Sequence, residues 1–142
     1  MLRHPRPAWI AAALALAVGA AGCGGREGGG GETDGGGSGE TVTVDAAEGV
    51  EVTGGEYFFD PETVVAEGGG GSLEITFVND GSIAHNLTVF DDDSEVAATE
   101  TFPGGEEDTV TADLEPGTYR MVCTVANHEE LGMVGEIEVR GR

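Results

Sequence analysis

The sequence predicts an all-β fold, a β-sandwich of seven to eight short strands within residues 41–142. Three observations lead to this prediction. Short runs alternate apolar with polar residues, as half-buried strands do. Residues typical of turns, such as Asn79-Asp80-Gly81 and Glu115-Pro116-Gly117, separate these runs at regular intervals. No segment shows the apolar spacing of an amphipathic helix.

The predicted strands follow one another along the chain with turn residues between them. Leu73, Ile75 and Phe77 share one face of the central one, since side chains alternate between the faces of a strand. One run, 96–101, fits either a strand or irregular structure. The candidate runs, from which the seven to eight strands are expected to form, are in order 41–44, 50–52, 57–59, 63–66, 73–77, 85–90, 96–101, 110–114, 118–123 and 133–139.

Residues 1–22 have the features of a secretory signal peptide. Arg3 and Arg6 precede an apolar run over 8–21, which is too short for a convincing membrane-spanning helix. Ala20-Ala21-Gly22-Cys23 is similar to a bacterial lipobox, although Ala20 stands where Leu is usual. We therefore predict a lipoprotein-type signal with lipid attached to Cys23. The alternative is an ordinary signal peptide that is cut nearby.

Residues 23–40 predict a flexible linker between this anchor and the domain at 41–142. Ten of the residues from 24 to 40 are Gly, a composition that cannot form a core. Such a random coil spans on the order of 20 to 25 Å. The protein is therefore expected to be exported and lipid-anchored on the extracytoplasmic face of the cell membrane, either periplasmic or outer.

The charge balance is strongly acidic and excludes one class of partner. Six basic residues, none of them Lys, stand against 27 acidic ones, and the formal net charge is −21. Nucleic-acid binding needs basic patches and is not expected. The charge allows steering toward a redox partner with a basic surface. General solubility explains it equally well.

Cys123 is the one cysteine left after Cys23, so no internal disulfide is available to it. His128 and Met133 follow it at five-residue intervals, in a loop between two predicted strands. His85, at the start of another predicted strand, supplies a second imidazole. Two His, one Cys and a weakly held Met form the ligand set of blue-copper electron-transfer sites. Structural zinc sites usually hold four strong ligands, and Met is not among them.

The motifs His85-Asn86 and Cys123-x4-His128-x4-Met133 resemble those of the cupredoxin family, the relatives of plastocyanin and azurin. The resemblance extends over about 48–139 and includes Tyr57-Phe-Phe-Asp-Pro61, the turn at Asn79 and the turn at Glu115. It implies a Greek-key sandwich with one Cu(I)/Cu(II) ion per domain. His85, Cys123 and His128 are then the near-trigonal ligands and Met133 the long axial ligand.

The resemblance also assigns supporting roles. Asn86 is expected to hydrogen-bond to the loop that carries Cys123, and the edge of His128 to serve as the electron port. Many relatives have Pro-Gly before the loop histidine, where this chain has Ala126-Asn127. Glu129 and Glu130 beside the port are candidates for orienting a cationic partner, or simply part of a solvated loop.

The sequence thus predicts a blue copper protein that carries single electrons and is not an enzyme. A cytochrome or a terminal oxidase is the expected redox partner. The alternative is an exported copper chaperone or storage module that hands copper to an oxidase. Such proteins more often have Met-rich or His-rich tracts, whereas this chain has three Met and three His. Copper enzymes and binuclear centres need further His or Cys ligands.

Overall fold

The computed structural model describes residues 39–142. The predicted signal peptide, the predicted lipid attachment at Cys23 and the linker up to residue 38 lie outside the described residues. Within residues 39–142, no helix is long and apolar enough to cross a membrane. The first strand of the described part begins at Thr41.

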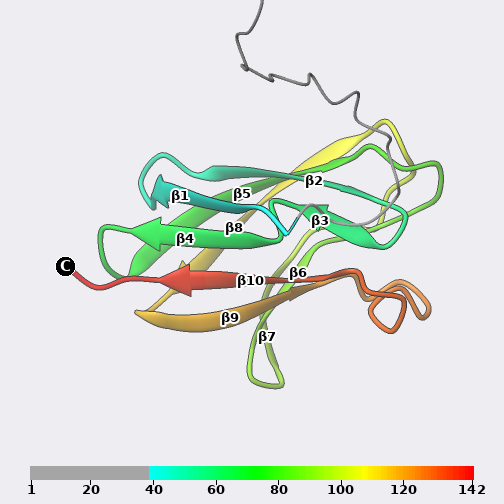
Figure 1. The fold of residues 1–142 in the computed structure, drawn as a ribbon. Coiled ribbons are helices and arrows are strands. Elements are labelled where there is room, and N and C mark those ends of the chain that lie inside the picture. Colours follow the sequence, from blue (N-terminus) through cyan, green and yellow to red (C-terminus); the bar gives the residue numbers. More distant parts are fainter. Residues whose placement is uncertain (1–38) are drawn as a thin grey trace, which may run out of the picture. The chain divides into compact units, whose positions relative to one another are not determined.

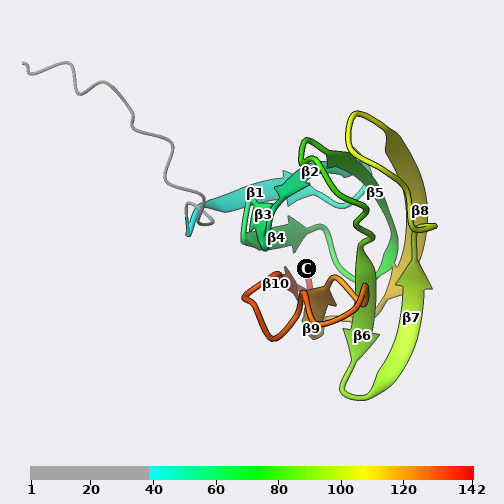
Figure 2. The same ribbon diagram turned by 90° about the vertical axis from the view of Figure 1, so that its right-hand side faces the viewer.

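Ten strands form two sheets that pack face to face (Figures 1 and 2). One sheet has six strands in the order β1-β4-β10-β9-β6-β7, and the other has four in the order β3-β2-β5-β8. Strand β4 pairs in parallel with β1 and β10, and β2 pairs in parallel with β5. The strands are β1 Thr41–Asp45, β2 Val50–Gly55, β3 Phe58–Asp60, β4 Thr63–Glu67, β5 Gly71–Asn79, β6 Thr88–Asp91, β7 Ser94–Ala98, β8 Glu107–Leu114, β9 Gly117–Val122 and β10 Val134–Val139.

The predicted all-β sandwich is confirmed, but the strand number differs from the expected seven to eight. Two of the ten strands are very short, since β3 has three residues and β6 has four. The run that begins at His85 is not a continuous strand. His85 forms an isolated bridge with Phe102, and the backbone N–H of Leu87 donates to the Thr99 hydroxyl rather than to a ladder. The region left open, 96–101, is strand only as far as Ala98.

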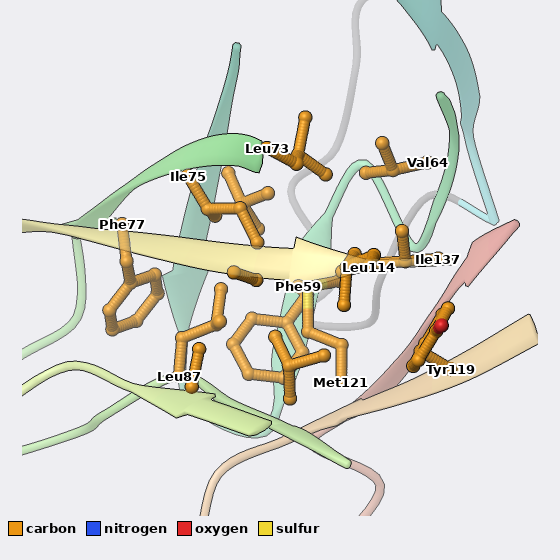
Figure 3. Packing of buried hydrophobic residues seen from close by; sticks show 14 of the residues in the cluster. Phe59, Val64, Leu73, Ile75, Phe77, Leu87, Leu114, Tyr119, Met121 and Ile137 are labelled. Atoms are coloured by element: carbon orange, nitrogen blue, oxygen red, sulfur yellow. The ribbon is translucent and has the colours of Figure 1, made fainter. Parts of the chain in front are cut away.

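The core lies between the two sheets (Figure 3). One sheet contributes fully buried Phe59, Ile75 and Phe77, and the facing sheet contributes Met121 and Ile137. Phe59 and Phe77 pack edge to face, with ring centroids 5.7 Å apart. Fully burying side chains of this size stabilises the fold by roughly 1.5–3 kcal/mol each. This packing fixes the strands from which the ligand-bearing loops depart.

The start of β9, the strand that leads to Cys123, is anchored by a tyrosine. The Tyr119 hydroxyl donates to the Glu115 carbonyl at 2.9 Å and accepts from the Glu115 N–H at 3.0 Å. The Glu115-Pro116-Gly117 turn is thereby closed onto the strand that follows it. In Figure 1 the segment after β9 lies at the end of the sandwich opposite the C-terminus, together with the segment that joins β5 to β6.

Candidate metal centre

One loop carries three of the predicted ligands. Cys123 directly follows β9 and Met133 directly precedes β10. The Cys123 N–H donates to the Met133 carbonyl at 3.1 Å, and the Met133 N–H donates to the His128 carbonyl at 3.0 Å. A further turn bond runs from the His128 N–H to the Val125 carbonyl at 3.0 Å. These backbone bonds hold the loop closed at its base.

His85 lies between β5 and β6, and its backbone is fixed to a neighbouring segment. Its N–H and carbonyl each bond to Phe102, at 3.1 Å. The buried side chain of Asn79 reinforces this arrangement, because its amide donates to the carbonyls of Ile83 and Phe102 at 3.0 and 2.9 Å. Buried amides with satisfied hydrogen bonds rigidify the segments that they join. His85 therefore sits in a loop that is cross-linked on both sides.

The two histidines and the cysteine converge. Nδ1 of His85 lies 3.1 Å from Nδ1 of His128, and Sγ of Cys123 lies 3.8 and 3.5 Å from these two nitrogens. All three residues are buried, and only His128 retains some exposure, at 6%. Within residues 39–142, this is the one group of three or more metal-binding side chains.

The chemistry of the donors fits a metal ion. Burial, followed by the proximity of His128, lowers the pKa of His85, while Glu56 opposes this shift. His85 is thus neutral, which is the form that binds metal. Atoms that share an ion at bond lengths of about 2.0–2.3 Å must lie within about 4.6 Å of one another. All three separations meet this limit, and thiolate with imidazole donors suits copper.

Met133, the predicted axial ligand, lies fully buried at the end of the same loop. A Cβ on Gly54 of β2 would lie 3.1 Å from the Met133 methyl carbon and 2.6 Å from a ring carbon of Phe77. Glycine at this position therefore leaves room for the methionine side chain.

Asn86 connects the two ligand segments. Its side-chain amide donates to the Thr124 hydroxyl at 2.9 Å, and its side-chain oxygen accepts from the Thr124 N–H at 2.9 Å. Thr124 directly follows Cys123. Both polar ends of the Asn86 side chain are therefore engaged across the site.

Two further features shape the ligand loop. Ala126, the first residue of the Ala126-Asn127 pair before His128, adopts φ 48°. A left-handed conformation costs a residue with a Cβ roughly 1–2 kcal/mol. Glu129 forms an ion pair with Arg120 of β9. One of the two carboxylates considered for orienting a partner is therefore already paired within the domain.

The sequence interpretation missed the turn between β2 and β3. The Tyr57 ring packs edge-on against His128, with centroids 5.1 Å apart. Oε1 of Glu56 lies 3.9 Å from Nε2 of His85. The glycine pair Gly54-Gly55 before these residues is the local signal that could have indicated a turn here. Nothing local, however, placed Glu56 beside His85, 29 residues further along the chain, or Tyr57 beside His128, 71 residues further along.

Residues 46–140 match the family described as copper binding proteins, plastocyanin/azurin family. The match covers more than half of the chain, and the chain belongs to this family, the cupredoxins. Copper is its cofactor, and the site of His85, Cys123 and His128 is consistent with a single ion. Curated protein sequences contain no match to the chain.

Solved structures agree on the fold. Auracyanin from the photosynthetic bacterium Roseiflexus castenholzii is 24% identical over 63% of this chain and 94% of its own, with a TM-score of 0.57. Azurin from the methylotroph Methylomonas sp. strain J is 15% identical over 64% and 96%, with a TM-score of 0.57. Rusticyanin from Thiobacillus ferrooxidans is 23% identical over 70% and 82%, with a TM-score of 0.59.

The paired hydrogen bonds of Asn86 lead to a first prediction. Asn86→Ala removes both bonds and leaves the Thr124 N–H without its acceptor, so we expect it to lower the free energy of unfolding of the copper-free protein by about 1–3 kcal/mol. Denaturant titration measures this change. Thr124→Val is the matched control, because it keeps the backbone donor and removes only the hydroxyl. An Asn86→Ala loss no larger than that of the control would contradict the assignment.

Proposed function

We propose that this protein is a mononuclear type 1, or blue, copper protein that carries single electrons outside the cytoplasm. The observation that carries the proposal is the buried convergence of Nδ1 of His85, Nδ1 of His128 and Sγ of Cys123. Cupredoxins are typically electron carriers rather than enzymes. Within residues 39–142 no second group of metal-binding side chains accompanies this site, as a multicopper enzyme would need.

In this proposal His85, Cys123 and His128 are the strong ligands, and Met133 is the weak axial one. Copper, when bound, supplies the one-electron couple between Cu(I) and Cu(II). The chain holds the donors in one arrangement through the Cys123–Met133 backbone bond and the Asn86–Thr124 pair. Donors that are fixed in advance need little rearrangement when the charge on the ion changes. The apolar core that surrounds the thiolate then tunes the potential.

His128 is the proposed electron port, because it is the histidine of the site that retains exposure. Leu131, in the same loop, is 48% exposed and offers apolar surface beside it. The partner is a redox protein such as a cytochrome or a terminal oxidase. The net charge of −21 favours a partner with a basic docking surface, since complementary charge accelerates association.

The anchor completes the proposal. The signal-like segment 1–22 and Cys23 support export and lipid attachment, and the Gly-rich residues that follow support a flexible tether. A lipid-anchored carrier searches for its partner across a membrane surface rather than through solution.

Copper loading tests the ligand assignment. The wild-type protein with Cu(II) is expected to show an intense visible thiolate-to-copper band, and Cys123→Ser is expected to abolish it, because the thiolate is the electron donor of that transition. Absorption and paramagnetic resonance spectra measure this. A colourless Cu(II) adduct of the wild type with ordinary tetragonal spectra would contradict the proposal.

Met133→Leu tests the axial role. The substitution conserves volume but removes the thioether, which stabilises Cu(II) weakly, so the band is retained and the reduction potential rises. We expect the potential to rise by about 59 mV, which corresponds to a tenfold change in the one-electron equilibrium between Cu(II) and Cu(I). Voltammetry measures the potential and also whether copper stays bound over repeated cycles. Loss of copper from the variant would contradict the weak axial role, because it would show that the ion needs Met133 to stay bound.

Lipid attachment is tested in cells. Cys23→Ala is expected to move the full-length protein from the membrane fraction to the soluble exported fraction, because the acyl chains that hold it can no longer be attached. Fractionation followed by immunoblotting measures the distribution. An unchanged membrane fraction for the variant would indicate that Cys23 is not the anchor.

A further inference from the structure

The turn between β2 and β3 delivers one side chain to each of the two histidines of the copper site. Glu56 and Tyr57 are the two residues of this turn, since Gly55 pairs with Phe58 across it. The Tyr57 ring lies against His128, and the Glu56 carboxylate faces Nε2 of His85. Tyr57 adopts φ 72°, a conformation that costs energy in a bulky residue. Such strain is typical of segments whose position serves a functional site.

Nε2 of His85 needs a partner. Of the side-chain nitrogens and oxygens in residues 39–142, it is the one that is buried without a hydrogen bond. When Nδ1 binds a metal ion, the ring proton resides on Nε2. Metal-binding histidines almost always present this N–H to a carboxylate, a carbonyl or water, which orients the ring. Oε1 of Glu56, at 3.9 Å, is the charged group that faces it.

The position of the Glu56 carboxylate is set by the loop that leads to His85. Oε1 accepts from the Ser82 N–H at 2.7 Å, the Ser82 hydroxyl at 3.0 Å and the Ile83 N–H at 3.2 Å. The Ser82 backbone bond, above all, holds the pKa of Glu56 below its usual value, so the group is an anion. A Cβ on Gly81 would lie 2.9 Å from Oε1, so glycine there leaves room for the carboxylate.

We propose that Glu56 is a positioning residue of the copper centre: its carboxylate orients the imidazole of His85 through Nε2–H and shifts the copper couple toward Cu(II). The distance of 3.9 Å exceeds that of a hydrogen bond, and the interaction is therefore electrostatic. An anion near the ion favours its higher charge state, and an N–H drawn toward a carboxylate makes the opposite nitrogen a stronger donor. This inference rests on the proposed function of the site.

The first test is the reduction potential of the copper-loaded protein. Glu56→Gln is nearly isosteric and removes the charge, so we expect the equilibrium to move on the order of tenfold toward Cu(I), about 59 mV. Glu130→Gln is the matched control, because Glu130 lies two residues from His128 on the exposed loop, whereas the charged groups that shift the pKa of His85 are His128 and Glu56. We expect a smaller shift in the control. Equal shifts in the two variants, or none in Glu56→Gln, would overturn the proposal.

The second test uses the copper-free protein and a readout that a merely structural role would not move. Nitrogen-15 NMR of the histidine rings reports which nitrogen carries the proton. We expect the Nε2–H form of His85 to predominate in the wild type and its population relative to the Nδ1–H form to fall at least twofold in Glu56→Gln. Identical populations in the two proteins, even with a lower unfolding free energy in the variant, would contradict the positioning role.

The two tests separate this inference from the function on which it rests. If the wild-type protein binds Cu(II) without the thiolate band, the blue-copper function fails, whatever Glu56 does. If the wild type shows the band and Glu56→Gln leaves potential and ring tautomer unchanged, the function stands and the role of Glu56 is refuted.

Discussion

The structure depends on the placement of three polar donors in a space closed to water. Nδ1 of His85, Nδ1 of His128 and Sγ of Cys123 lie within 3.8 Å of one another, in residues that are at most 6% exposed. Without an ion, two neutral imidazoles at 3.1 Å can share only one proton between them. A single cation satisfies both lone pairs and the sulfur together. The arrangement is therefore one that the surrounding fold must impose.

The sandwich imposes it through cross-links that surround the site. Asn79 secures the segment before His85, Asn86 joins that segment to Thr124, and the backbone bond from Cys123 to Met133 closes the ligand loop. Two of these links join segments far apart in sequence, since Asn79 reaches Phe102, 23 residues away, and Asn86 reaches Thr124, 38 residues away. The linked segments continue into strands whose side chains pack in the core. The ligands therefore cannot move apart without disturbing that packing. The rigidity of the copper site is thus a property of the whole sandwich.

The sequence predicted the fold class and the donor set because both follow from residue identity and short-range spacing. Alternation located most strands, and Cys123, His128 and Met133 stand five residues apart in one loop. Strand β7 could not be assigned, since its first three residues are exposed and only Ala97 is buried. An exposed edge strand lacks the alternation that reveals a half-buried one.

The role of the β2–β3 turn could not be predicted for a different reason. Glu56 and Tyr57 stand next to a glycine pair, which signals only a turn. Their position beside His85 and His128 arises from long-range pairing, in which β2 joins β5 in parallel while the ligand loop returns at the same end of the sandwich. Likewise, the break in the strand at Leu87 depends on the Thr99 hydroxyl, which is twelve residues away.

The most direct test of this account compares crystal structures of the copper-free and copper-loaded protein. If the fold places the donors in advance, the separations among His85 Nδ1, His128 Nδ1 and Cys123 Sγ stay within a few tenths of an ångström of 3.1, 3.5 and 3.8 Å in both structures. A copper-free structure in which one imidazole turns away, or in which the ligand loop opens, would contradict it.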